Sequence, residues 1–561
     1  MLGHLSNRRW HVLILCILPL AMVLPGISTL PVIDRDEARF AQASVQMAES
    51  NDLLNIRFQD EARNKKPAGA YWAQTAAIKA LSNDGKRRIW VHRLPSVLAA
   101  MLSILALYWG GLRMVGRNAA LIAAALMATT TIFVFEGHIA KTDALLCAAT
   151  TLMLASLGRL RNGGGLREVW AFWIALGFSI LIKGPIGPIL AIFSIFSLGI
   201  WEKNLSWARP LLNWGAIGLF VLMWLPWGIA MFIITDGAFF SESIGQDLGG
   251  KVVSEQEGHG AFPGYHAILV WMALWPASLF LLPGFTYALQ AIRSGGDNPI
   301  IRSMRLILCW IIPFWVLIEV MPTKLPHYGL PIFPALCLMI GTGIIAMSKL
   351  EGFSKTRFIG GLIFLFSTSF LLGALLFVQS QYGAADDAIE AYLICGLSGL
   401  SAIIAAFALW GKKINLSLGS AILSAMIYLI GAYGFVLSDM TQFKTSERLV
   451  AELESFAPGT ESRDIHSPHY SEPSLVYHMG QEIDLRAHDI DLTEKKVAIL
   501  NTLRDTAEAQ HNTLEEAAKS RGRCLEKSNL VKGFSYSRGI PLSLIILREG
   551  PCEASRQIAP L

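Results

Sequence analysis

Residues 11–30 read HVLILCILPLAMVLPGISTL, and the charged stretch Asp34-Arg35-Asp36-Glu37-Ala38-Arg39 follows three residues later. Twenty residues without Lys, Arg, Asp or Glu can cross the hydrocarbon core of a bilayer as one helix. Arg8 and Arg9 precede the run, as they would in a secretory signal. The run is long for the apolar core of such a signal, and no small-residue cleavage site follows Leu30. We therefore predict an uncleaved membrane helix, and the charged residues that follow it are candidates for a functional site.

The composition extends this prediction to the whole chain. Of 561 residues, 53% are hydrophobic and only 16% charged, and the mean hydropathy is +0.47. Soluble proteins carry about 25% charged residues. The deficit predicts a polytopic α-helical membrane protein. The net charge of +5 is small for this length and does not indicate a nucleic-acid-binding protein.

Apolar runs separated by polar breaks predict about thirteen spans. They cover residues 11–30, 91–111, 119–135, 144–157, 169–182, 186–200, 212–234, 267–291, 306–320, 328–347, 358–378, 391–410 and 416–437. Several are shorter than the roughly 20 residues that a span needs. Merged or re-entrant segments therefore remain an alternative around Lys183-Gly184-Pro185.

The charges of the short loops orient these spans. Basic residues gather in alternate loops, whereas each intervening short loop holds one basic residue or none. The basic set is Arg113, Arg117, Arg159, Arg161, Arg167, Lys203, Arg209, Arg293, Arg302, Arg305, Lys349, Lys355, Arg357, Lys412 and Lys413. Cytoplasmic loops are the ones enriched in Lys and Arg. We predict a bacterial inner-membrane protein with a cytoplasmic N-terminus and a periplasmic C-terminal tail.

Two regions lie outside the predicted spans. The first outer loop, 31–90, is long and basic, which the loop-charge rule tolerates, and its apolar segment 68–81 predicts an interfacial helix. The transmembrane domain covers 1–438, and 439–561 predicts a periplasmic α/β domain. That domain has expected helices at 445–456 and 514–520 and expected strands at 474–478, 496–500, 530–537 and 542–547. Cys524 and Cys552 would be able to pair there.

The outer loops carry the candidate chemistry. Asp36 and Arg39 lie three residues apart and share one face if a helix begins here. Asp36 is then either a helix cap or a carboxylate base beside a cation that binds an anionic substrate. Asp143, Lys183 and Lys324 stand at the edges of apolar runs, where ionisable residues are functional candidates by default, although Asp143 could also serve as a helix cap.

Two further loop segments leave alternatives open. Lys66, in Lys65-Lys66-Pro67, is either a snorkelling anchor or a phosphate ligand. The outer loop 235–265 holds His259 among several carboxylates, so a divalent metal is a possible cofactor, but no tight metal-ligand spacing is present.

Five motifs in order on this one face resemble a known family. They match the bacterial lipid-to-lipid glycosyltransferases typified by the aminoarabinose transferase that modifies lipid A, and the related protein O-mannosyltransferases, within the GT-C superfamily that uses polyprenyl-phosphate sugars. The motifs are Asp36-Glu37-Ala38-Arg39-Phe40-Ala41, Lys66-Pro67 with Tyr71-Trp72, Lys141-Thr142-Asp143, Lys183-Gly184-Pro185 and Lys324-Leu325-Pro326-His327-Tyr328. Ser471-Glu472-Pro473-Ser474-Leu475-Val476-Tyr477 resembles the family's periplasmic domain.

The resemblance implies roles for single residues. Asp36 matches the family's essential first-loop aspartate and Asp143 its second acidic residue, so these two are the catalytic candidates. Arg39, Lys66 and Tyr328 match positions that contact the carrier-lipid phosphate. Our further candidates for binding substrate or phosphate are Lys183, Lys324 and His259. Four features depart from the aminoarabinose enzymes: Phe40 in place of tyrosine, Lys65 in place of glutamate, His327 before the tyrosine, and the loop 255–260.

The expected activity is an inverting transfer of a sugar from a polyprenyl-phosphate carrier to a periplasmic acceptor, lipid A or the lipopolysaccharide core. Cations stabilise the leaving phosphate and a carboxylate deprotonates the acceptor. Protein O-glycosylation is the nearest alternative. A secondary transporter is the alternative from another class, but transporters place ionisable residues near mid-membrane and often show repeated halves, whereas these charges cluster in outer loops.

Overall fold

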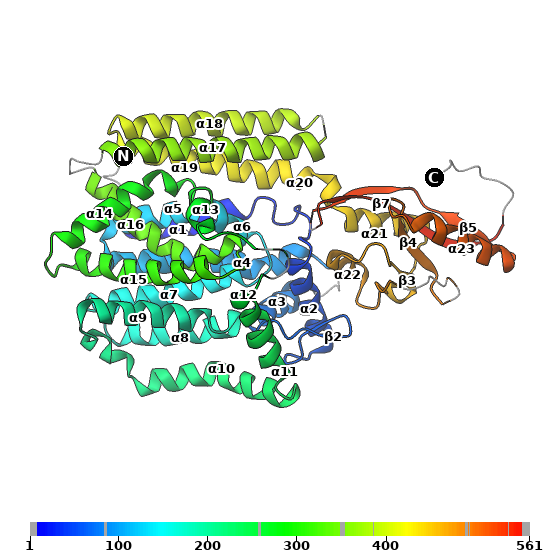
Figure 1. Ribbon diagram of the computed structural model, residues 1–561, viewed down its shortest axis with the longest axis horizontal. Coiled ribbons are helices and arrows are strands. Elements are labelled where there is room, and N and C mark those ends of the chain that lie inside the picture. The colour runs from blue at the N-terminus through cyan, green and yellow to red at the C-terminus, as the bar shows by residue number, and fades with distance from the viewer. Residues whose placement is uncertain are drawn as a thin grey trace.

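The computed structural model describes residues 8–82, 87–255, 258, 260–347, 354–384, 386–487, 492, 494–536 and 538–552. A bundle of roughly parallel helices makes up most of the molecule, and a sheet-containing C-terminal domain extends from one end of it (Figure 1). The long helices are α1 (Arg8–Val23), α4 (Ile89–Met114), α5 (Arg117–Ala128), α7 (Asp143–Arg161), α8 (Leu166–Lys183), α9 (Ile186–Glu202), α10 (Trp214–Ile234), α14 (Leu281–Arg293), α15 (Pro299–Val320), α16 (Phe333–Met347), α17 (Ser354–Tyr382), α18 (Ala388–Trp410) and α19 (Ile414–Gly431).

The bundle holds several helices that suit a membrane. Among the described residues, eight helices are long and apolar enough to span one, or up to ten if two bent pairs each count as one span. One bent pair joins α5 to α6 (Thr131–Gly137) at 62°, and the other joins α13 (Tyr265–Ala273) to the segment Ala277–Arg293 at 112°. The predicted multi-pass helical architecture is thus present, with a smaller count than the thirteen apolar runs.

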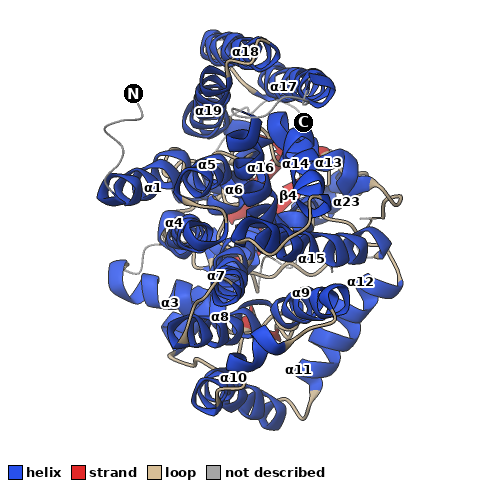
Figure 2. Cartoon of the chain, turned by 90° about the vertical axis from the view of Figure 1, so that its left-hand side faces the viewer, coloured by secondary structure: helices blue, strands red, loops and turns tan. Residues whose placement is uncertain are grey.

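Helices in the bundle differ in how much they are enclosed. Helices α7 and α16 lie inside, whereas α10 and α17–α19 form its periphery (Figure 2). Small residues allow close contact at the centre: a Cβ on Gly110 of α4 would lie 2.5 Å from the Cβ of Ala155 on α7. Small residues are typical of such helix interfaces in membranes. Asp143, the first residue of α7, therefore starts a helix that its neighbours hold firmly.

The first loop forms a compact platform at one end of the bundle. It contains α2 (Asp36–Ser50), a hairpin of β1 (Arg57–Phe58) and β2 (Glu61–Ala62), and α3 (Gly69–Leu81). The helix predicted over 68–81 is present one residue shorter. Its buried side chains, which include Tyr71 and Gln74, face α2.

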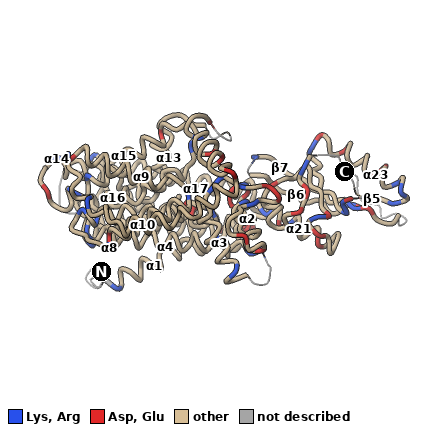
Figure 3. The backbone as a smooth tube through the Cα atoms, turned by 90° about the horizontal axis from the view of Figure 1, so that it is seen from below, with Lys and Arg blue, Asp and Glu red and all other residues tan. Residues whose placement is uncertain are grey.

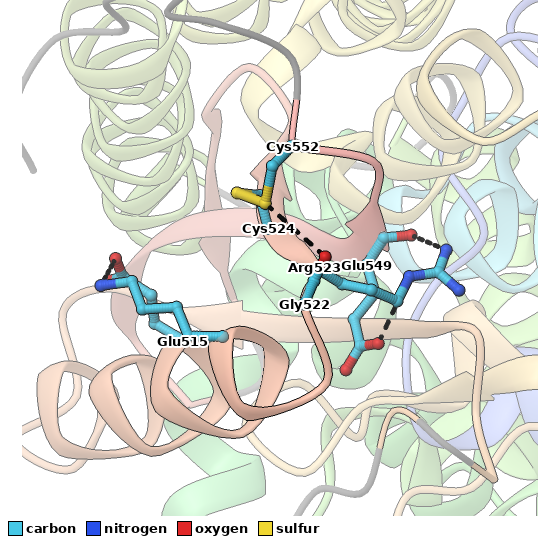
Figure 4. The surroundings of a disulfide bond; sticks show 7 residues. Glu515, Gly522, Arg523, Cys524, Glu549 and Cys552 are labelled. Carbon is cyan, nitrogen blue, oxygen red and sulfur yellow. Dashed lines mark hydrogen bonds and ion pairs between the residues drawn. A yellow bond between two sulfur atoms is a disulfide. The ribbon is translucent and has the colours of Figure 1, made fainter.

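The C-terminal domain follows three short helical segments at 432–443, which include α20 (Leu437–Asp439), and it is built on a five-stranded sheet. Strand order is β3 (Ile465–His466), β4 (Val497–Asn501), β7 (Ile540–Gly550) and β5 (Cys524–Lys527), and β6 (Val531–Ser535) also pairs with β7. Of the pairs between these described strands, only β3–β4 is parallel. Helices α21 (Thr445–Phe456) and α23 (Ala507–Ser520) complete it. A disulfide joins Cys524 to Cys552, the two cysteines expected to be able to pair (Figure 4).

One predicted element of this domain is wrong. Residues 474–478 were expected as a strand, and they form helix α22 (Pro473–Met479) instead. A short apolar run does not distinguish a buried strand from a buried helix. Pro473 at the first helical position favours the helix, and tertiary contacts fix it: the Ser474 amide donates to Asp34 Oδ1 at 2.8 Å.

The same helix attaches the C-terminal domain to the first loop. Arg87 donates to the carbonyls of Val476 and Tyr477 at 3.1 and 2.7 Å. At the turn of the β1–β2 hairpin, Gln59 donates to two carbonyls of the domain, Gln481 at 3.0 Å and Ile483 at 2.7 Å. The domain therefore rests on the loop that carries Asp36.

Candidate active site

Asp36 is an exposed carboxylate at the start of α2. The preceding Arg35 has a φ of 68°, a value that costs about 1–3 kcal/mol for a residue with a side chain. Within the described part of the chain, the Asp36 side chain has no hydrogen bond or ion pair. Its charge is nevertheless felt by Lys141 and by Tyr71. A strained turn thus presents an uncommitted carboxylate beside a cationic region.

The adjacent Glu37 points the other way and is fully buried. Its two oxygens accept from Arg93 Nε and Nη2, both at 2.9 Å, in a bidentate pair. The same carboxylate accepts the amides of Ile33 at 2.8 Å and Ala140 at 2.8 Å. Burying this ion pair is tolerable because its hydrogen-bonding capacity is used.

Arg93 in turn fastens the chain that leads to Asp36. Its guanidinium donates to the carbonyls of Ile27, Leu30 and Pro31 at 2.8–3.1 Å. Together with Glu37 it therefore ties helix α4, the end of the first span, α2 and the loop before α7 at one point. This network fixes the position of Asp36 relative to Asp143.

A second group of charges surrounds Asp143. Lys183, the last residue of α8, donates to Asp143 Oδ1 at 2.6 Å. Lys141 lies 3.6 Å from Asp143 Oδ2 and 3.1 Å from Glu136 Oε1. Both oxygens of the buried Glu136 lack a hydrogen bond of good geometry. Asp143 and Lys183, predicted separately from the sequence, are thus in direct contact.

His327 joins this group from a distant part of the sequence. It lies on the short helix η5 (Pro326–Ile332), and its Nδ1 is 3.7 Å from Glu136 Oε1 while its Nε2 is 3.8 Å from Asp143 Oδ1. The imidazole therefore stands between two carboxylates. We refer to Glu136, Lys141, Asp143, Lys183 and His327 as the ionic cluster.

Charge within the ionic cluster favours protonated lysine. Burial alone would lower the pKa of Lys141, but the carboxylates of Glu136 and Asp143 outweigh burial and raise that pKa above its usual value. The Asp36 charge acts in the same direction. Lys141 therefore stays cationic at every physiological pH.

Lys66 forms a neighbouring charged group with the segment after α10. It is paired with Asp247, whose other oxygen accepts from Lys251 at 2.9 Å. Burial, and then the charge of Lys251, lower the pKa of Lys66 to about 8, although Asp247 opposes this shift. Asp247 lies on the π-helical segment η3 (Ser241–Gly249), none of whose residues is buried. The ammonium of Lys66 thus already holds an anionic oxygen.

The remaining predicted site residues differ in their placement. Lys324 donates to the carbonyls of Ile318 at 3.4 Å, Glu319 at 2.8 Å and Met321, so the end of α15 takes up its ammonium. Tyr328 is partly buried beside His327. Arg39 is partly buried, and its charge acts on Asp34. His259 lies outside the described residues.

The departures from the family pattern can also be placed. Phe40 is buried and stacks on Tyr71 with ring centroids 4.7 Å apart, beneath the guanidinium of Arg63. Lys65 is exposed. A phenyl ring suffices at position 40 because the polar partner of Arg63 is the Tyr71 hydroxyl, at 3.2 Å.

Sequence reasoning missed the structural roles of Arg93, Glu136 and Asp34. Arg93 had a signal, since an arginine inside an apolar span is costly and needs a partner. Asp34 touches the distant Ser474, and burial raises its pKa to about 7 against the effect of that hydrogen bond. No local sequence pattern predicts a contact between positions 34 and 474.

A metal finds no prepared site in the described part of the chain, where no group of three or more His, Cys, Asp or Glu side chains could hold an ion. Glu136, Asp143 and His327 come near one another, but Lys141 contacts both carboxylates and Lys183 contacts Asp143. Two of the possible metal ligands in the loop 235–265, Glu257 and His259, lie outside the described residues.

Comparison with known proteins identifies relatives. Residues 10–236 match the family model of dolichyl-phosphate-mannose-protein mannosyltransferases. An undecaprenyl phosphate-alpha-4-amino-4-deoxy-L-arabinose arabinosyl transferase of Pectobacterium carotovorum is 24% identical over 56% of this chain and 55% of its own length. A relative of the same name from Pseudomonas fluorescens is 26% identical over 67% and 66%. The aligned part of the chain thus spans little more than half of the first of these relatives.

Solved structures extend the likeness to the whole fold. ArnT from Cupriavidus metallidurans, crystallised with undecaprenyl phosphate, superposes with a TM-score of 0.69, 16% identity and coverage of 96% of this chain and 98% of that one. An Archaeoglobus fulgidus oligosaccharyltransferase gives a TM-score of 0.52, 12% identity and coverage of 88% and 70%. The resemblance that the motifs predicted is therefore confirmed: the chain shares the fold of ArnT, and its sequence is similar to that of the arabinosyl transferases.

Proposed function

We propose that this chain is an inverting glycosyltransferase that moves a sugar from a polyprenyl-phosphate carrier to lipid A or the lipopolysaccharide core. The observation that carries the proposal is Asp36, an exposed carboxylate held beside Lys141 by the Glu37–Arg93 pair. The likeness to proteins named arabinosyl transferases, and to ArnT crystallised with undecaprenyl phosphate, supports the same reaction class.

The residues suit a single displacement. The acceptor oxygen attacks the anomeric carbon, the bond from that carbon to the phosphate oxygen breaks, and the phosphate leaves with the electron pair. Asp36 takes the acceptor's proton as general base. Lys66 receives the departing phosphate, which replaces Asp247 as the anionic partner of its ammonium. Preorganised cations of this kind stabilise charge that grows in the transition state.

The ionic cluster supplies further positive charge for that displacement. Asp143 holds Lys183 and Lys141 in place, so their positive charge meets a substrate phosphate without prior rearrangement. Arg39 and Tyr328 are proposed to contact the same phosphate. Lys324 is left out of the phosphate site because backbone carbonyls already take up its hydrogen bonds.

The proposed topology places this site outside the cytoplasm. Adding α1, α8 and α9 to the upper count of ten candidate spans would give the thirteen predicted from the apolar runs. Lys and Arg gather at the end of the bundle far from the C-terminal domain (Figure 3). Because cytoplasmic loops carry that excess, the opposite end, with Asp36 and residues 439–561, is proposed to face the periplasm of a bacterial inner-membrane protein.

The decisive experiment replaces Asp36 by Asn and measures sugar transfer from a polyprenyl-phosphate donor to lipid A. We expect activity to fall about a hundredfold or more, since a general base contributes about 10²–10⁴ in rate. Yield and melting temperature should stay unchanged, because Asp36 is exposed and unpaired. Glu37→Gln is the matched control, which should lower stability as well. Full activity in Asp36→Asn would refute the assigned role.

Protein O-glycosylation remains a second candidate, favoured by the family model that matches residues 10–236. Intact-mass analysis distinguishes the two acceptors. Deletion of the gene should remove a sugar from lipid A or core oligosaccharide under the first proposal, and from secreted proteins under the second.

A further inference from the structure

A small cavity lies beside the candidate active site and takes no part in the mechanism above. Its volume is about 140 Å³, and it lies between the β1–β2 hairpin and the end of α10. The hairpin side contributes Asn55, Ile56, Arg57, Asp60, Ala62 and Asn64, and α10 contributes Met231 and its C-cap Thr235.

The cavity lining includes polar groups without a protein partner. Asn64 is only 8% exposed, and its side-chain amide, which keeps contact with solvent, has no hydrogen bond in the described part of the protein. Arg57 and Asp60 are exposed and without a direct hydrogen bond or ion pair among the described residues. The cavity therefore offers amide, guanidinium and carboxylate groups that are available to a ligand.

The floor of the cavity is apolar, in contrast to its rim. Ile56 is 3% exposed and Met231 is 1% exposed. Polar and apolar side chains thus line the cavity together, and the polar groups of a small-molecule site fix the orientation of its ligand. A sugar ring matches this pattern, because its hydroxyls hydrogen-bond at the edge while its C–H face packs on aliphatic side chains.

The surroundings hold the cavity in shape at the end of a candidate membrane span. Gln46 of α2 donates to the Gln59 carbonyl at 2.8 Å and accepts its amide at 3.0 Å, so the hairpin turn is fixed from within the loop. Thr235 ends the apolar helix α10, one of the candidate spans. Asn64 stands two residues before Lys66. A lipid that reaches Lys66 from the bilayer can therefore place its headgroup here.

We propose that this cavity binds a glycosyl headgroup of a membrane lipid, with Asn64, Arg57 and Asp60 contacting its hydroxyls. The proposal rests on the proposed function, since it supplies that reaction with a specificity site. The headgroup belongs either to the sugar donor or to a glycolipid acceptor. Both present the same chemistry of vicinal hydroxyls on a ring.

The test uses the full-length protein and four single variants, Asn64→Ala, Arg57→Gln, Asp60→Asn and the control Glu61→Gln. Glu61 is an exposed residue of the same hairpin that does not line the cavity. Arg57 and Asp60 are exposed, so their variants fold even if Asn64→Ala does not. KM for the donor lipid and KM for the acceptor lipid are measured separately for each variant. We expect kcat to stay unchanged.

We expect each cavity variant to raise one KM about fivefold, the effect of one hydrogen bond, and Glu61→Gln to change neither. A rise confined to the acceptor assigns the cavity to the acceptor headgroup, and a rise confined to the donor assigns it to the transferred sugar. Unchanged KM values for both lipids in the Arg57 and Asp60 variants would overturn the proposal.

A direct binding arm separates this inference from the proposed function. Binding of vesicles that contain lipid A and of vesicles that contain a glycosylated polyprenyl phosphate to Asp36→Asn protein is measured with and without Asp60→Asn. Weaker binding of one lipid in the double variant supports the cavity even if no sugar transfer is found in any preparation. Equal binding of both lipids contradicts it.

Discussion

Two charged networks lie side by side at the end of the bundle next to the C-terminal domain, and they are built differently. In the first, Glu37 and Arg93 are both fully buried, and their oxygens and N–H groups meet carbonyls, amides or each other. In the second, the ionic cluster, Glu136 has no hydrogen bond of good geometry, and His327 stands 3.7 and 3.8 Å from two carboxylates.

The difference distinguishes a structural network from one that can bind substrate. A saturated buried pair has no capacity left for a ligand, so its contribution is the position of the chain around it. Loosely paired charges keep hydrogen-bonding capacity that a substrate can use, at a cost in stability. Asp36 is next to Glu37 of the first network in sequence, and its charge acts on Lys141 of the second.

Breaking the saturated network should have the largest effect on folding. Arg93→Ala leaves the Glu37 carboxylate buried and unpaired, which costs about 3–5 kcal/mol. We expect low yield and a clearly lower melting temperature in detergent, measured by intrinsic fluorescence. Arg93→Lys keeps the charge but loses the bidentate geometry, so its melting temperature should lie between those of Arg93→Ala and the unaltered protein. A melting temperature equal to that of the unaltered protein in Arg93→Ala would show that the network is not structural.

Breaking the ionic cluster should affect turnover more than folding. Asp143→Asn removes the partner of Lys183, whereas Lys141 keeps Glu136 at 3.1 Å. We expect kcat/KM to fall about a hundredfold, the usual effect of losing one preorganised electrostatic group, with a smaller change in melting temperature than in Arg93→Ala. If Asp143→Asn were active but unstable, the ionic cluster would be structural and the proposed distinction between the two networks would be wrong.

The two networks also differ in how far the sequence could predict them. Asp143 and Lys183 were identifiable because charges at the ends of apolar runs are rare and costly. Their contact was not predictable, since it depends on how α7 and α8 pack. The same holds for His327, which the sequence marked only as a departure from the family pattern, and for Arg93, whose partner lies 56 positions away.

The fold shows a similar limit. Period and hydropathy predicted the helical bundle, the helix of the first loop and most strands of the C-terminal domain. They failed at 474–478, where helix α22 forms against the first loop. A tertiary contact decides the outcome there, and no local pattern records it.

Titration of Lys66 sharpens the comparison by pH. Its pKa is lowered to about 8, chiefly by burial, so the ammonium loses its proton as pH rises through 8. If the charged form binds the donor phosphate, kcat/KM for the donor should be about tenfold lower at pH 9 than at pH 7. Lys66→Arg stays charged over this range and should lose that decline, even at reduced activity. The same decline in both proteins would assign it to another group.

Lys324 gives the smallest expected effect and tests whether an outer-loop cation can be purely structural. Three carbonyls at the end of α15 take up its ammonium, and a cation at a helix C-terminus contributes up to about 2 kcal/mol in partly buried geometry. Lys324→Met keeps the chain length and removes the donors, so it should lower the melting temperature by a few degrees and leave KM for the donor lipid unchanged. Lys324→Arg, which keeps the charge, should be closer to the unaltered protein in melting temperature. A rise in donor KM in Lys324→Met without loss of stability would return Lys324 to the phosphate site. It would also mean that Lys324 gives up its hydrogen bonds to α15 and binds the phosphate when the lipid arrives. A full set of hydrogen bonds in the ligand-free protein would then no longer distinguish a structural charge from one that binds substrate.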